Sequence, residues 1–223
     1  AVVLLLASAF VEQGPEEAGQ MLPGGGRDMG WREMLCQKKF YGMCAMLLCG
    51  GLSGMMVISS ASDMAQVEAG FSPAAAALMV SVLSLFNAGG RASAGILSDK
   101  LGRIGTLSLV FPISVAALCA LFFFGQDSMA VFAVSIALVG ACFGALMGIF
   151  PGFTADEFGQ RNNTVNYGIL FFGFALSGML GPQVASWVMS GTGSYRSAFL
   201  IAAVVALAGF ALTFLHRRLA ARS

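Results

Sequence analysis

Six apolar stretches, each long enough to cross a lipid bilayer, dominate the 223-residue sequence. A helix needs about 20 mostly apolar residues to span the hydrocarbon core. Charged residues make up only 10% of the chain, against about 25% in a typical soluble domain. The sequence therefore predicts an all-α membrane protein with a bundle of six transmembrane helices, at residues 40–62, 73–97, 105–125, 129–153, 165–190 and 197–215.

The positions of the basic residues predict how this bundle is oriented. If the six helices alternate in direction, only Arg196 lies on one side of the membrane, and Arg91 lies within a span. The other side carries ten basic residues, which are Arg27, Arg32, Lys38, Lys39, Lys100, Arg103, Arg161, Arg217, Arg218 and Arg222. Because basic loops stay in the cytoplasm, we expect a multi-pass protein of the plasma or inner membrane with its N-terminal loop and C-terminal tail cytoplasmic.

Four segments follow from this pattern. Residues 1–10 are apolar but only half the length of a span, and we interpret them as the end of a truncated transmembrane helix. Residues 11–39 form a cytoplasmic central loop, a Gly-rich tether followed by a short interfacial helix around Trp31. Residues 40–215 form the six-helix transmembrane domain, and residues 216–223 form the cytoplasmic tail.

Arg91 is a charged residue deep inside a predicted span. It precedes Asp99, at the span boundary, by eight residues, which places it about 12 Å deep in a core about 30 Å thick. An arginine there costs at least ~2.5 kcal/mol, so its side chain should face a cavity or a partner. Asn87 and Gly95 share its helix face. Arg91 either binds an anion such as a carboxylate or pairs with an acidic residue in a part of the protein that this chain lacks.

A short motif follows Arg91. Residues 95–103, Gly-Ile-Leu-Ser-Asp-Lys-Leu-Gly-Arg, resemble the signature loop of the major facilitator superfamily, G-x-L-[AS]-D-[RK]-x-G-R. In that superfamily the loop joins the second and third helices of each six-helix half and latches the cytoplasmic gate. The resemblance assigns the gating motif to Gly95, Asp99, Lys100, Gly102 and Arg103. We expect Gly95 to allow close helix contact, Gly102 to allow a tight turn, and Asp99 to meet a helix N-terminus or Arg103.

The same resemblance predicts the fold and its partner. It implies one half of a major facilitator fold, built from two inverted three-helix repeats. The long basic loop before the first full span indicates the C-terminal half, so the expected partners are the lipid bilayer and a missing N-terminal six-helix half.

A longer pattern resembles the oxalate:formate antiporter family of monocarboxylate and dicarboxylate carriers. It comprises Trp-Arg-Glu-Met-Leu at 31–35, the spacing of Asn87 and Arg91, and residues 142–159 and 166–182. The resemblance implies a secondary active transporter that moves a small organic anion by alternating access. It makes Arg91 the substrate-facing arginine, and we add Asn87 and Tyr167 as substrate-binding candidates.

One position departs from this family. Phe174 stands where the oxalate carrier has a lysine in its eleventh helix, and residues 165–190 contain no basic residue. A single cation neutralises a dianion poorly, so a monocarboxylate is the expected substrate.

Four glycines at intervals of four residues mark one face of the fourth span, at Gly140, Gly144, Gly148 and Gly152. Small residues at this spacing let a second helix approach closely. We interpret them as a packing groove, although the same groove would also let helices rock during a transport cycle.

Other functions fit the sequence less well. A non-transporting sensor or assembly subunit on the same fold, and a carrier for a neutral solute, remain alternatives. The spans hold no His, acid pair or nucleophile–base set, so we expect no enzyme activity and no cofactor. The five cysteines lack metal-ligand spacing, which predicts no metal site, and we expect no nucleic-acid partner.

Overall fold

The computed structural model describes residues 28–220, and every helix or strand assigned in that part of the chain is a helix. The predicted end of a truncated helix at 1–10 and the Gly-rich tether therefore lie outside the described residues. Six helical segments are long and apolar enough to cross a membrane, as predicted. The helices are α2 (Trp31–Leu35), α3 (Lys38–Ile58), α4 (Ala61–Ala69), α5 (Pro73–Leu101), α6 (Arg103–Phe124), α7 (Met129–Phe158), α8 (Asn163–Leu170), α9 (Phe172–Thr192) and α10 (Arg196–Ala220).

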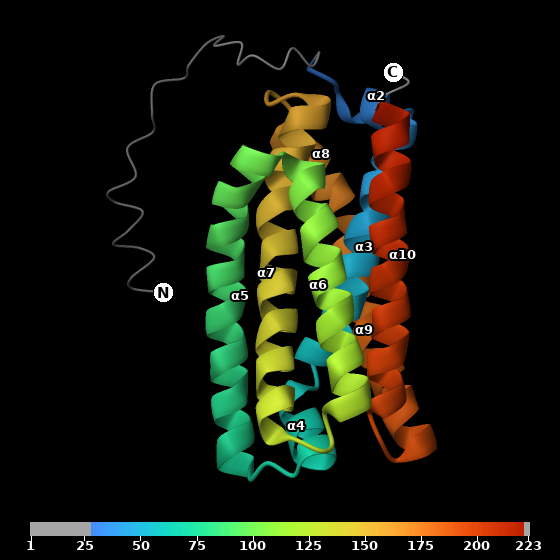
Figure 1. Ribbon diagram of the computed structural model, residues 1–223. Helices are drawn as coiled ribbons and strands as arrows, with labels where there is room; N and C mark the ends of the chain where they lie inside the picture. The colour runs from blue at the N-terminus through green and yellow to red at the C-terminus, as the bar shows by residue number, and fades with distance from the viewer. Residues whose placement is uncertain (1–27, 221–223) are drawn as a thin grey trace, which may run out of the picture.

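The long helices run side by side between two ends of the bundle (Figure 1). We call the end that carries residues 98–103, α2 and the C-terminal turn of α10 the motif end, and the end that carries α4 the far end. The described basic residues other than Arg91 and Arg196 all lie at the motif end. This clustering matches the distribution expected of a cytoplasmic face.

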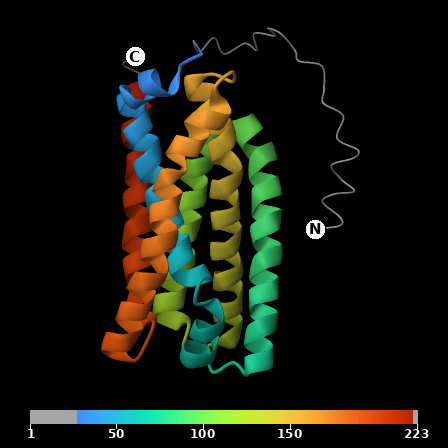
Figure 2. The ribbon, with the colours of Figure 1, turned by 180° about the vertical axis from the view of Figure 1, so that it is seen from behind.

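The packing of the helices reveals an internal pseudo-symmetry. The repeats are α3, α5 and α6, and then α7, α8–α9 and α10. The second helix of each repeat packs on the first helix of the other, α5 on α7 and α9 on α3. The third helices do the same, α6 on α7 and α10 on α3 (Figures 1 and 2). This reciprocal pattern confirms the predicted half of a major facilitator fold.

Helix α7 lies at the centre of the bundle and is the most deeply buried of the six spans. Its side chains meet α5, α6 and α3. Large apolar residues from several helices fill the core around it, and those with almost no exposed surface include Phe111, Phe132, Phe150, Phe153, Phe158 and Phe199.

The segment after the first span differs from the prediction. The spans predicted at 40–62 and 73–97 leave a connecting loop between them, but α3 ends at Ile58 and α4 follows. This segment contains the charged residues Asp63 and Glu68. The segment also buries Ala61, Met64, Ala65 and Ala69, the i, i+3, i+4 spacing of a helix that packs on one face.

Other span boundaries also shift. Helix α5 runs to Leu101 rather than residue 97, and α7 runs to Phe158 rather than residue 153, because helices continue past the apolar core with their charged residues in the last turn. The fifth span consists of two helices that meet at Phe171. Backbone hydrogen bonds cross this junction, from Phe171 N–H to Tyr167 O at 2.8 Å and from Ala175 N–H to Phe171 O at 3.0 Å.

Glu68 ties the loops of the far end together. Its buried carboxylate accepts hydrogen bonds from Ser194 Oγ at 2.9 Å, from Gln126 Nε2 and from the Tyr195 N–H. Burial raises the pKa of the Tyr195 phenol, and the Asp63 carboxylate acts in the same direction.

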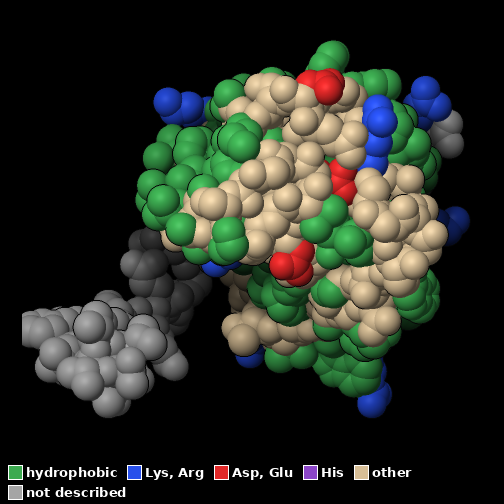
Figure 3. Space-filling model, turned by 90° about the horizontal axis from the view of Figure 1, so that it is seen from below, with side chains coloured by type: hydrophobic (Ala, Val, Ile, Leu, Met, Phe, Trp, Pro, Cys, Tyr) green, Lys and Arg blue, Asp and Glu red, His purple; other side chains and the backbone are tan. Residues whose placement is uncertain are grey.

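The rest of this face carries scattered acidic side chains within a rim of hydrophobic ones (Figure 3).

The segment before α3 is anchored at the motif end. The Met29 N–H donates to Phe158 O at 2.9 Å, and the Asn166 side-chain amide donates to Met29 O at 3.1 Å. Met34 of α2 is fully buried, whereas Trp31 is exposed, with the Arg32 guanidinium 5.0 Å from its ring centroid. The short helix expected around Trp31 is therefore present and packs against the bundle.

Candidate functional site

The glycine face of α7 receives the backbone of α5. A Cβ atom added to Gly140 would lie 2.9 Å from Leu83 O, and one added to Gly148 would lie 2.7 Å from Arg91 O. At Gly144, between them, the added atom would collide with Asn87 O. The two helices therefore touch backbone to backbone, which only small residues permit. The groove holds the part of α5 that carries two of the predicted site residues, Asn87 and Arg91.

The Arg91 side chain extends beyond this contact between α5 and α7. The start of its side chain passes α7, since its Cγ would lie 3.2 Å from a Cβ at Gly148. The residue is exposed and forms no salt bridge with the residues the structure describes. Asn87, one turn away, is half-buried. The backbone is thus fixed while the guanidinium stays available.

Tyr167 lies within the electrostatic reach of Arg91 and begins a row of aromatic rings. Ring centroids are 5.5 Å apart between Tyr167 and Phe171, 4.7 Å between Phe171 and Phe174, and 6.0 Å between Phe174 and Phe143. The row leads from α8 through α9 to α7. Phe174, which the resemblance places at the position of the family's lysine, is half-buried within this row. The rings thus form a continuous aromatic row from Tyr167 on α8 to Phe143 on α7.

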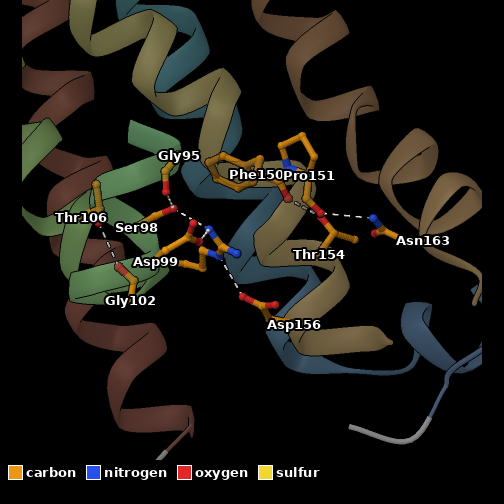
Figure 4. A network of polar contacts seen from close by, with 11 residues as sticks. Gly95, Ser98, Asp99, Gly102, Thr106, Phe150, Pro151, Thr154, Asp156 and Asn163 are labelled. Atoms are coloured by element: carbon orange, nitrogen blue, oxygen red, sulfur yellow. Dashed lines mark hydrogen bonds and ion pairs between the residues drawn. The ribbon is translucent and has the colours of Figure 1, made fainter. Parts of the chain in front are cut away.

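The signature motif forms an ionic network at the motif end (Figure 4). Arg103 Nε lies 2.8 Å from Asp156 Oδ2, and Arg103 Nη1 lies 3.0 Å from Asp99 Oδ1 and also donates to Ser98 Oγ. Gly102 turns the chain between α5 and α6 with φ +75°, a conformation that favours glycine. Arg103 therefore connects the end of α5, the start of α6 and the end of α7.

Gly152 belongs to this network rather than to the contact with α5. A Cβ atom there would lie 2.9 Å from the guanidinium carbon of Arg103. The fourth glycine of the α7 face thus makes space for the arginine of the motif. Of the two partners expected for Asp99, the structure selects Arg103.

Two motif residues lie outside this network. A Cβ atom at Gly95 would meet no atom of the described chain within 4 Å, so the close helix contact expected there stays a prediction. Gly90 does make a close helix contact, since a Cβ on it would collide with the Ala141 backbone. Lys100 is exposed and joins none of the described salt bridges.

Sequence reasoning missed Asp156 as the partner of Arg103. The two residues are 53 positions apart, so no local pattern joins them. The only signal was that an acidic pair, Asp156 and Glu157, follows a long apolar run at the same end of the bundle as the motif.

We predict that the Arg103–Asp156 contact is energetically coupled. In a double-mutant cycle, Arg103→Gln and Asp156→Asn together should destabilise the protein less than the sum of the single changes, by up to ~1 kcal/mol, because both side chains are partly exposed. The measurement is equilibrium unfolding in mixed detergent and dodecyl sulfate micelles. Lys100→Gln combined with Asp156→Asn is the control and should be additive. Additivity in both cycles would show that the contact contributes nothing.

The helices, their composition and their reciprocal packing define a multi-pass membrane protein. A family model described as the Major Facilitator Superfamily matches residues 1–182. The chain belongs to this superfamily, which confirms the resemblance seen in the motif.

Curated relatives include carriers with named substrates. The chain is 26% identical over 220 residues to the oxalate:formate antiporter of Oxalobacter formigenes, covering 97% of this chain and 52% of the relative. An uncharacterized MFS-type transporter of Escherichia coli, YhjX, is 34% identical over 150 residues, which cover 67% of this chain and 37% of the relative. Monocarboxylate transporter 12 of Xenopus laevis is 27% identical over 150 residues, which cover 66% of this chain and 31% of the relative. The chain spans about half of these relatives' length or less.

Proposed function

We propose that this chain is the C-terminal half of a secondary active transporter that moves a small organic anion by alternating access. The observation that carries the proposal is Arg91, an exposed guanidinium in a membrane span with no salt-bridge partner among residues 28–218. A charge at that depth requires a polar partner. Membership of a transporter superfamily and relatives named for oxalate, formate and monocarboxylates support an anion in that role.

The geometry suggests how Arg91 would hold its substrate. Packing of α5 into the α7 groove fixes the backbone at Asn87 and Arg91, so the backbone loses little conformational freedom when the guanidinium binds an anion. Its planar fork matches the two oxygens of a carboxylate. A site at the middle of the membrane would be shared with an N-terminal six-helix half, which would cover this face of α5. The motif end, with its basic residues, would face the cytoplasm.

A monocarboxylate fits this site better than a dianion. Among the residues described on α8 and α9 there is no basic side chain. The side chains that follow Tyr167 in this row are instead the apolar rings of Phe171, Phe174 and Phe143. One cation neutralises one carboxylate, and an apolar wall disfavours a second charge.

The test is to add a second positive charge to the site, at residue 174. In this chain assembled with an N-terminal half, Phe174→Lys should shift the ratio of oxalate to formate uptake upward about tenfold or more, because a charge-assisted hydrogen bond contributes about 1.5–3 kcal/mol. Uptake into proteoliposomes of each labelled anion is the measurement. Phe174→Met, which removes the ring without adding charge, is the control and should keep the wild-type ratio. An unchanged ratio in a correctly inserted Lys variant would exclude Phe174 as a selectivity position.

A further inference from the structure

His216 is a buried ionisable side chain that the proposed transport site does not use. It lies near the motif end of α10 with only 1% of its surface exposed. Its Nε2 atom is 3.6 Å from Glu157 Oε1 on α7, and the other oxygen of Glu157 is 3.3 Å from Lys39 Nζ on α3. Neither ring nitrogen has a hydrogen-bond partner within the described chain.

Protonation would change what the ring can offer to Glu157. A neutral ring carries one N–H donor and one lone pair, and here both are buried without partners, which costs free energy. A protonated ring carries two N–H donors, and the one on Nε2 would lie beside the Glu157 carboxylate. A small movement of either side chain would convert the 3.6 Å approach into a charge-assisted hydrogen bond.

The surroundings leave Glu157 as the acid that His216 can pair with. Lys39 competes for the same carboxylate from α3. Phe153 packs edge-on against the imidazole, with ring centroids 5.3 Å apart. The polar contact that α6 makes with this part of α10, Ser108 to Thr213, is uncharged. No described salt bridge joins α6 or α9 to this end of α10, and Arg217 and Arg218, next on α10, are exposed.

We propose that His216 is a proton-binding site whose occupancy ties the motif end of α10 to α7 through Glu157. The proton comes from water at the motif end, which can reach the site through the Glu157 side chain, 19% exposed. It binds Nε2, and the resulting imidazolium shares the carboxylate with Lys39.

The last turn of α7 connects the His216 site to the ionic network of the signature motif. Asp156 faces Arg103 at the junction of α5 and α6, whereas its neighbour Glu157 faces Lys39 of α3 and His216 of α10. The last turn of α7 thus contacts the ends of three other helices, α3, α6 and α10. A proton on His216 would strengthen one side of that junction and leave the motif side unchanged.

The chain contains a single histidine, so isotope-labelled histidine gives the NMR signals of one imidazole ring, which belong to His216 without further assignment. We would record its titration between about pH 5 and about pH 9 in the whole chain, in lipid nanodiscs and without a histidine tag. Glu157→Gln should lower the midpoint of the transition by about one pH unit or more, because an opposite charge at this distance favours the protonated ring. Lys39→Gln should raise it, because a competing cation is removed.

Asp156→Asn is the matched control, since it removes the neighbouring acid that faces Arg103, and it should leave the midpoint unchanged. An equal midpoint in wild type and Glu157→Gln, or a ring that does not titrate in this range, would overturn the proposal. If Glu157→Gln does not fold, the Lys39→Gln variant decides, and a midpoint that does not rise is the contrary result. None of these readouts depends on transport.

Discussion

Replacing Arg91 by alanine is expected to reduce carboxylate uptake about 100-fold or more, while leaving insertion into the membrane intact. The loss corresponds to a charge-assisted, bidentate contact of up to about 3 kcal/mol. Arg91→Lys keeps the charge but loses the fork, so it should also lose uptake. The measurement is uptake of labelled formate into proteoliposomes by this chain assembled with an N-terminal half.

Arg218→Ala is the control for this prediction, because Arg218 is an exposed arginine at the motif end and its removal should leave uptake unchanged. Alanine also relieves the cost of burying a charge in the membrane, so the Arg91→Ala protein should be at least as stable as wild type. Normal uptake by Arg91→Ala would remove Arg91 from the binding site.

Gly144 is the position where a side chain should damage the fold most. Its α carbon faces the Asn87 backbone so closely that even the Cβ of alanine would collide with Asn87 O. Backbone cannot move aside as the end of a flexible side chain can. We expect Gly144→Leu to destabilise the protein by about 3 kcal/mol or more, the upper range for overpacking.

Gly89 offers the matched control for Gly144. It lies on α5 close to the same contact, but a Cβ there would meet no atom within 4 Å. Gly89→Ala should therefore be neutral or stabilising, since alanine favours helix more than glycine does. Unfolding in mixed micelles compares the variants, and equal stability of Gly144→Leu and Gly89→Ala would show that the α5–α7 contact is not as close as described.

The long spans were predictable because lipid imposes a length and composition that a single sequence displays directly. The turn at Gly102 and the pair of Asp99 with Arg103 were predictable for a related reason, since both lie within one short motif. The α7 groove was visible as four glycines at a regular spacing, but that spacing does not distinguish Gly152, which accommodates Arg103, from the glycines that contact α5.

Contacts between residues far apart in the chain could not be predicted. Asp156 and Glu157 are adjacent, yet they face different helices, and their partners lie in three other parts of the sequence. His216 falls in the predicted cytoplasmic tail at 216–223, whereas the structure buries it against α7. Helix α4 was missed because its charged residues lie among the buried apolar residues Ala61, Met64, Ala65 and Ala69.

The central claim is that this chain forms one half of a carrier for an organic anion. Counterflow tests it most directly, with the chain assembled with an N-terminal half and reconstituted in vesicles preloaded with unlabelled formate. We predict a transient accumulation of labelled formate that disappears in Arg91→Ala. Binding of formate without any counterflow would contradict the claim and would instead indicate a sensor built on the same fold.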